Sequence, residues 1–495
     1  MEASRRHFLD AAALLALASP LEARAASAKH SANAPKDAVA MAQAVREGRT
    51  TPLALVNQAI ARLEAANPKV NCVAFPHFDR ARERANAGVT GALGGVPTLI
   101  KDNTAQKGLP NTNGLRMFVG NVAERNDPYV EAIERVGMIS IGRSTLPELA
   151  SNVTTESALT GVTRNPWNLD YTSGGSSGGA SAAVAAGVVP LAHGNDAAGS
   201  IRHAAAPCGL VGLKASRGRM AGDEKSRDVT QQIVQGGLSR TVRDTAAWFA
   251  ATESQSPDAA FKPVGLVTSP VSRKLRIGIR QEMPRTGAKP APEVQSVFDT
   301  SAALLARLGH EVRQSPLAYD GPVSGEAYVQ LWEGRMARLF ADLEKKFGRH
   351  LTPEDIEPRL LGMGEHGRGV SDARMGECLE IVRTAARRHA AQFGAFDVYM
   401  TPVFTTEPIR IGELGPRGSW DDQRQRLMDY ACYCWIDNLA GTPAITLPMG
   451  FSPRGLPIGI QFSAAPGEER MLLELSYQLE GERRWWLKRP PIWVG

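Results

Sequence analysis

The sequence predicts an α/β fold, a single large domain with a mixed, mostly parallel central sheet flanked by helices. First, 43% of its 495 residues are hydrophobic and 22% are charged, the balance of an ordinary globular protein. Second, short strand-like apolar runs alternate with alanine-rich helical runs between Gly91 and Thr241. Third, buried strand-like runs return at 396–403 and 441–461, so a distant segment is expected to complete the first sheet.

Helical signals justify the elements on either side of this core. Residues 39–65 have helical periodicity, broken by a turn, and a helix restarts with Thr51 as its N-cap and Pro52 at its first position. Further along the chain, a strand is expected at 275–279, and a helix at 294–308. No internal repeat is found.

The first residues resemble an export signal. Arg5 and Arg6 precede a short apolar stretch, Ala11 to Ala18, and small-residue cleavage sites follow. Eight apolar residues cannot span a bilayer of about 30 Å, so a stable membrane anchor is not expected. We interpret residues 1–28 as a twin-arginine-type signal that delivers the protein to the periplasm, an amphipathic N-terminal helix being the alternative.

Charge and cysteine content exclude several classes of protein. The net charge is +6, but the basic residues are scattered and form no stripe for binding phosphates, so no nucleic-acid partner is expected. Five dispersed cysteines form neither a disulfide framework nor a Cys-x-x-Cys metal site. We therefore expect no metal and no cofactor.

The densest chemical signal is the glycine-rich segment 174–179. It lacks the lysine and the spacing of a phosphate-binding loop. It matches Gly-x-Ser-x-Gly, but the preceding residues are rich in turn formers, whereas a nucleophile elbow needs a strand there. The remaining interpretation is a backbone-rich loop in which Ser176 and Ser177 relay protons or bind ligand.

Element lengths place a second loop beside Ser176. A helix at 179–188 would be about 15 Å long, and a strand at 189–193 would run about 17 to 20 Å in the opposite direction. The loop at 194–200 should therefore end near Ser176, followed by a helix at 201–208. Free N–H groups in this turn could bind an oxyanion where Ser200 attacks a carbonyl carbon.

A nucleophilic serine needs a base, and a lysine is the strongest candidate. His193 and His203 are the histidines near the loop, and neither has a recognisable orienting acid, so a Ser-His-Asp triad is the weaker alternative. Lys101 directly follows an apolar run that ends at Ile100. Burial at such a strand end would lower the lysine pKa from about 10.4 toward neutrality.

Four separated motifs, in order, resemble the amidase signature family: residues 94–102, 174–179, 196–202 and 208–214. The resemblance extends more faintly from about residue 38 to 490. It implies a domain at 36–490, with core motifs at 91–245 and a variable substrate-pocket region at 246–440.

The resemblance also implies a Ser-cisSer-Lys triad. In it Ser200 is the nucleophile that forms an acyl-enzyme, Ser176 is a bridging serine after a cis peptide bond, and Lys101 is the neutral base. The backbone N–H groups of Ala197, Ala198, Gly199 and Ser200 would form the oxyanion hole. Ser177, Asp196 and Arg202 would support the loops, the last two as an ion pair.

One position departs from the family pattern: Ala198 stands where a glycine is common, and it would be strained if that position required a positive φ.

The expected activity is hydrolysis of a small, aryl or cyclic carboxamide to a carboxylate and an amine or ammonia. Alternatives are a periplasmic solute-binding protein and a glutamine-hydrolysing amidotransferase subunit. The sequence specifies neither the amide, nor a preference for linear or cyclic substrates, nor the oligomeric state, for which a homodimer is one option.

Overall fold

The central sheet has eight strands, and most neighbouring strands in it run antiparallel. The computed structural model describes residues 37–495, so the export signal expected at 1–28 lies outside the described residues. In spatial order the strands are β12 (Glu311–Gln314), β11 (Arg276–Ile279), β13 (Val398–Pro402), β15 (Pro457–Ala464), β14 (Ala444–Phe451), β9 (Val211–Lys214), β10 (Val234–Ser239) and β8 (Leu191–Asp196). β11 is parallel to β12 and β13, and the other five pairings are antiparallel.

The sheet is mixed, as predicted, but the expectation that it is mostly parallel is wrong. Strands β9, β13 and β15 are buried along their whole length. Continuous apolar runs are typical of parallel strands because helices cover both of their faces. An antiparallel strand covered on both faces has the same pattern, so its direction could not be deduced from hydrophobicity.

The return of the chain to the first sheet is confirmed. Ala444 of β14 pairs with Lys214 of β9, two strands more than 200 residues apart in the sequence.

A second sheet, of three strands, carries Lys101. Its order is β1 (Val73–Pro76), β3 (Ile139–Ser144) and β2 (Pro97–Lys101), with β2 parallel to β3. The hydroxyl of Thr98 donates a hydrogen bond to the Leu191 carbonyl of β8 at 3.1 Å. The end of β2 is thereby held against the edge of the central sheet.

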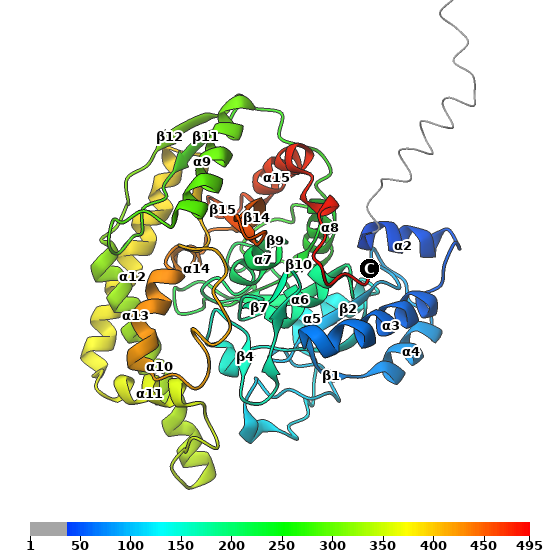
Figure 1. The fold of residues 1–495 in the computed structure, drawn as a ribbon, viewed down its shortest axis with the longest axis horizontal. Helices are drawn as coiled ribbons and strands as arrows, with labels where there is room; N and C mark the ends of the chain where they lie inside the picture. Colours follow the sequence, from blue (N-terminus) through cyan, green and yellow to red (C-terminus); the bar gives the residue numbers. More distant parts are fainter. Residues whose placement is uncertain (1–36) are drawn as a thin grey trace, which may run out of the picture. The chain divides into compact units, whose positions relative to one another are not determined.

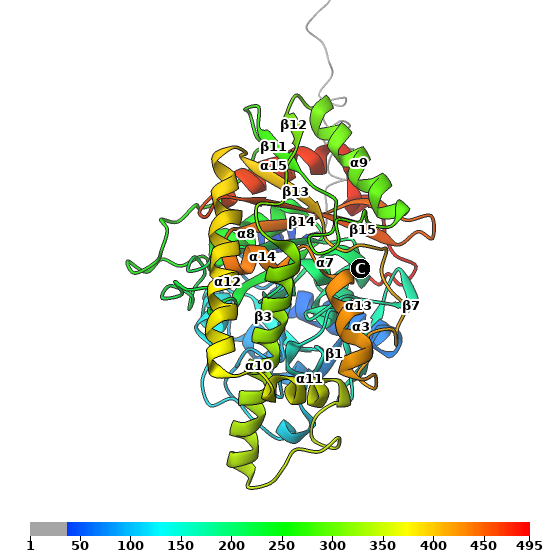
Figure 2. The same ribbon diagram turned by 90° about the vertical axis from the view of Figure 1, so that its left-hand side faces the viewer.

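Helices pack around these sheets. On the N-terminal side and in the core they are α2 (Ala38–Arg46), α3 (Pro52–Val70), α4 (Phe78–Asn86), α5 (Pro128–Arg135), α6 (Gly178–Ala186), α7 (Arg202–Cys208) and α8 (Val242–Thr252). Later in the chain come α9 (Pro292–Arg307), α10 (Gly321–Phe347), α11 (Pro358–Arg368), α12 (Asp372–Ala391), α13 (Trp420–Tyr430), α14 (Trp435–Ala440) and α15 (Glu469–Arg483). Figure 1 shows α10, α12 and α13 on the opposite side of the central strands from α2, α3 and α4, and in Figure 2 the side with α10 to α13 faces the viewer.

Short elements complete the chain. Single turns of 3₁₀-helix are η1 (Arg116–Phe118), η2 (Glu148–Ala150), η3 (Gln392–Gly394) and η4 (Trp485–Leu487). Two short hairpins pair β4 (Glu156–Ser157) with β5 (Gly161–Val162) and β6 (Arg164–Asn165) with β7 (Asn168–Thr172). The residues before the glycine-rich segment 174–179 were expected to form turns, but five of them form strand β7. The side chains at the start of β7 are partly exposed.

The local signals for helix starts are confirmed. Thr51 caps α3 and accepts a hydrogen bond from the Ala54 N–H, with Pro52 at the first position. The helix, strand and helix expected after the glycine-rich loop are α6, β8 and α7. None of the helices within residues 37–495 combines the length and the hydropathy that a membrane crossing requires.

Helix α6 lies deep in the core because its residues are small. All nine of its residues are buried. A Cβ added at Gly179 would lie 2.4 Å from the Thr145 backbone nitrogen, so only glycine permits this approach. The start of α6, and with it the loop that carries Ser176, is therefore fixed against the three-stranded sheet.

Candidate active site

Lys101 is fully buried at the end of β2, with its amine turned toward Ser176. Its Nζ lies 2.7 Å from Ser176 Oγ and donates a hydrogen bond to Asn195 Oδ1 at 2.9 Å. Burial lowers the pKa of this amine from 10.5 to about 7, although the Asp196 carboxylate opposes the shift. A substantial fraction of the amine is thus uncharged near neutral pH and able to accept a proton.

Ser176 follows a cis peptide bond, between Gly175 and Ser176. The loop from Ser173 to Ser177 is buried, and a Cβ at Gly175 would lie 2.7 Å from the Thr154 carbonyl oxygen. This segment therefore depends on glycine to fit between its neighbours. The family resemblance implied a cis bond at this position.

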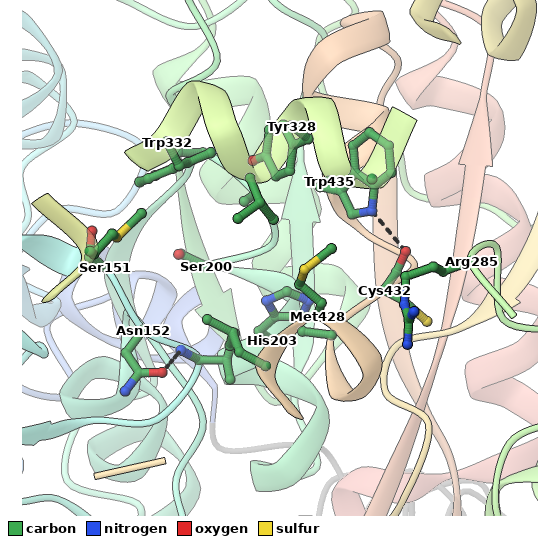
Figure 3. A pocket seen from close by; sticks show the side chains of 18 of the residues that line it. Ser151, Asn152, Ser200, His203, Arg285, Tyr328, Trp332, Met428, Cys432 and Trp435 are labelled. Carbon is green, nitrogen blue, oxygen red and sulfur yellow. Dashed lines mark hydrogen bonds between the residues drawn. The ribbon is translucent and has the colours of Figure 1, made fainter. Parts of the chain in front are cut away.

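The nucleophile loop lies directly beside this serine loop. Ser200 sits between β8 and α7, and the Ser177 N–H donates a hydrogen bond to the Ser200 carbonyl at 3.3 Å. Ser177 also donates from its hydroxyl to the Asn195 carbonyl at 3.4 Å, so it links both loops. The Ser200 side chain is partly exposed and lines a cavity (Figure 3).

Three of the four backbone amides expected in the oxyanion hole are free. Within residues 37–495, the N–H groups of Ala197, Ala198 and Ser200 have no hydrogen-bond partner in the protein. The Gly199 N–H instead donates to Asp196 Oδ1 at 2.7 Å, so Gly199 is removed from the expected donor set.

The glycine requirement of this loop falls on Gly199 and not on Ala198. Gly199 has a φ of +132°, and a Cβ there would lie 2.3 Å from the His203 ring. Ala198 is not among the residues with positive φ, so it carries no left-handed strain.

An ion pair between Asp196 and Arg202 braces the nucleophile loop, as expected. Both residues are completely buried, and the guanidinium donates to the two carboxylate oxygens at 3.0 Å each. Burial alone would raise the pKa of Asp196, but the Arg202 guanidinium holds it well below its usual range. Asp196 stays ionised and accepts from backbone N–H groups of the loop, which fixes the loop's shape.

Arg202 is also held by partners from the C-terminal part of the chain, which the sequence did not indicate. Arg202 Nη1 donates to Gln461 Oε1 at 2.7 Å and to the Cys434 carbonyl at 2.9 Å. Asp437 lies 3.3 Å from the same nitrogen, and the Asn438 amide donates to Asp196 Oδ1 at 3.0 Å. These residues are separated from Arg202 by more than 230 positions, so no local pattern connects them.

The two nearby histidines are packed side chains and not bases. Burial lowers the pKa of both His193 and His203 from 6.5 to about 3, so both rings are neutral. His193 Nδ1 accepts a hydrogen bond from the Lys101 N–H at 3.2 Å, and its Nε2 therefore donates to Gln235 at 2.9 Å. This supports the preference for a lysine base over a Ser-His-Asp triad.

An open cavity lies in front of Ser200. Its walls include the aromatic side chains of Tyr328 and Trp332 from α10 and of Trp435 from α14 (Figure 3). Of the described residues that line it, Arg285 alone carries a charge, and that guanidinium pairs with Asp429 at 2.6 Å. The cavity therefore suits an uncharged, largely apolar ligand.

All five cysteines are free and buried. Cys432 lines the cavity in front of Ser200, whereas Cys378 and Cys434 do not. The other four pack within hydrophobic clusters of the core.

Comparison with known proteins agrees with this geometry. The Amidase family model matches residues 54–473. A Mycobacterium tuberculosis protein, AmiC, which is provisionally named an amidase, is 38% identical over 91% of this chain and 95% of its own length. The 6-aminohexanoate-cyclic-dimer hydrolase of Paenarthrobacter ureafaciens is 34% identical over 92% of this chain and 97% of its own.

Solved structures give the same result. A 6-aminohexanoate cyclic dimer hydrolase complexed with substrate matches with a TM-score of 0.83 and 32% identity, covering 92% of this chain and 99% of that one. A bacterial aryl acylamidase of the amidase signature family matches with a TM-score of 0.79 and 25% identity, covering 91% of this chain and 96% of that one. The chain therefore belongs to the amidase signature family of amide-hydrolysing enzymes.

Proposed function

We propose that this enzyme hydrolyses an uncharged, largely apolar amide through an acyl-enzyme on Ser200, with Ser176 and Lys101 as its proton relay. The observation that carries this proposal is the buried Lys101 amine, 2.7 Å from Ser176 Oγ and with a pKa near 7. An ordinary lysine is charged at neutral pH and could not accept the proton.

The proposed reaction has two halves. Lys101 takes a proton from Ser176, Ser176 takes one from Ser200, and Ser200 Oγ attacks the amide carbonyl carbon. The resulting oxyanion is held by the free N–H groups of the nucleophile loop. The C–N bond then breaks as the proton passes to the leaving nitrogen, and water hydrolyses the ester to release the carboxylate.

The hydrogen bond between Lys101 Nζ and Ser176 Oγ supports the first step of the proposed relay. Within residues 37–495, Ser200 Oγ has no hydrogen-bond partner, so its hydroxyl is free to face the cavity. In ligand-free sites such contacts are often long and shorten once substrate binds.

The cavity argues against the glutamine-hydrolysing alternative. Free glutamine carries an ammonium and a carboxylate, and both need charged partners when bound away from water. Arg285 is the one charged group among the described lining residues, and Asp429 already neutralises it. Family membership likewise favours hydrolysis over simple solute binding.

We test the proposal with a serine-reactive fluorophosphonate, which needs no knowledge of the substrate. The wild-type protein should be labelled at Ser200, and Ser200→Ala should lose the label and at least about 10⁴-fold of amide turnover. The matched control is Ser269→Ala, a change of an exposed loop serine that should keep both. Labelling at another residue, or turnover retained by Ser200→Ala, would overturn the proposal.

We also propose that residues 1–28 direct export by the twin-arginine route. The paired Arg5 and Arg6 before a short apolar stretch support this, because paired arginines are the residues that the route recognises. Changing both arginines to lysine should move the enzyme from the periplasmic to the cytoplasmic fraction of a bacterial host. An unchanged distribution would contradict it.

A further inference from the structure

Helix α10 contains three glycines before its end, and an added Cβ would be closer than 3 Å to a neighbouring atom at two of them. Glycine destabilises a helix relative to alanine, so each needs an explanation. A Cβ at Gly321 would lie 1.6 Å from the Pro284 carbonyl oxygen, and a Cβ at Gly334 would lie 2.4 Å from Met375 Sδ. At Gly325 the nearest atom would be Met428 Cε at 3.8 Å, an ordinary contact.

Gly325 faces the active-site cavity. It lines the cavity together with Tyr328, Val329 and Trp332, which lie three, four and seven positions further along the same helical face. Met428, the neighbour that a Cβ would approach, also lines the cavity from α13 (Figure 3). A side chain at position 325 would therefore extend into the space in front of Ser200.

Backbone conformation does not explain this glycine either. Gly325 lies four residues inside α10 and is not among the glycines with positive φ. It is buried, yet the volume beside it is cavity and not protein. The missing side chain thus leaves space in the cavity and does not make room for another part of the protein.

We propose that Gly325 is a specificity-determining position that admits a bulky apolar group of the substrate between α10 and α13. This inference rests on the proposed function. The group is uncharged because the surrounding side chains, Tyr328, Trp332 and Met428, are aromatic or apolar. Its size is that of a ring or a folded alkyl chain, because the room at position 325 adds to the cavity in front of Ser200.

The test compares two fluorophosphonates, one with a methyl group and one with a phenylalkyl group, in Gly325→Ala and Gly325→Leu. The measured quantity is the ratio of the two rate constants for labelling of Ser200. In Gly325→Ala the rate constant for the phenylalkyl probe, divided by that for the methyl probe, should fall about tenfold. In Gly325→Leu the same ratio should fall by more than about a hundredfold. The Ala variant should also have a higher Tm than the wild type, since alanine favours the helix.

Gly376→Ala is the matched control. Gly376 lies in α12, is exposed and has nothing within 4 Å of an added Cβ. This change should raise Tm in the same way and leave the labelling ratio unchanged.

The outcomes separate this inference from the proposed function. If the wild type is labelled at Ser200 but the ratio is the same in wild type and Gly325→Ala, the inference is wrong and the proposed function stands. If the wild type is not labelled at Ser200, the proposed function itself fails. Should Gly325→Leu not fold, Gly325→Ala alone decides, because its added Cβ meets only an ordinary contact.

Discussion

The reaction centre and the cavity wall are built in different ways. Around Lys101, Ser176 and Arg202, polar groups are buried and tied to one another by hydrogen bonds and ion pairs. The cavity wall formed by α10, α11, α13 and α14 is instead aromatic and apolar. In it the rings of Tyr328 and Trp435 stack with their centroids 4.8 Å apart. We conclude that the chemistry is fixed by a rigid polar network, while substrate choice is set by the shape of an apolar wall.

If this division is correct, changes in the reaction centre should affect every substrate equally. We expect Ser176→Ala to reduce turnover of all amides by about 10² to 10⁴-fold, because it removes the hydroxyl that in the proposed relay carries the proton of Ser200 to Lys101. The fold should persist, since Lys101 Nζ keeps its hydrogen bond to Asn195. Turnover is measured on several amides and folding by circular dichroism. A loss confined to one substrate would contradict the division.

The network that holds the nucleophile loop should be sensitive to loss of a single charge. Arg202→Met leaves Asp196 buried without its partner, and removing one member of a buried ion pair costs about 3–5 kcal/mol. Urea unfolding measures this change in the free energy of unfolding.

Arg313→Met is the control, because Arg313 is exposed and its ion pair with Glu311 is at the surface. The account would be contradicted if both variants lost the same small amount of stability.

Changes in the cavity wall should alter selectivity and leave the chemistry intact. Trp332→Ala removes an aromatic wall, so KM for a bulky apolar amide should rise about tenfold, and kcat should change less. Trp486→Ala, outside the cavity, should leave KM unchanged. An equal fall of kcat for small and bulky amides would place Trp332 in the reaction centre instead.

The same division explains how much could be predicted from the sequence. Lys101 was identified because it ends an apolar run, and Ser176 and Ser200 because a helix and a strand of comparable length separate their loops. Asn195 falls within the loop expected at 194–200, but its contact with Lys101 depends on how β2 lies against β8. Nothing local indicates that contact.

Distant segments account for the rest. Asp437 and Asn438 lie in α14, directly before β14, and the pairing of β14 with β9 brings them to Arg202. This pairing is tertiary structure and has no local signal in the sequence. The sequence did not indicate that most strand pairs of the central sheet are antiparallel. Strands that are covered on both faces have the same apolar pattern in either direction. Gly325 and Trp332 lie on one face of α10, yet the sequence does not reveal that this face borders Ser200.

The most direct test of the account is the pH dependence of Ser200 labelling by a fluorophosphonate. Because only the uncharged Lys101 amine accepts a proton, the rate should fall about tenfold per unit below pH 7 and reach a plateau above it. The buried Lys214, whose pKa is lowered to about 8, provides the control: Lys214→Met should keep the inflection, and Lys101→Met should lose it. A rate independent of pH from 5.5 to 9, or an inflection that survives Lys101→Met, would contradict the account.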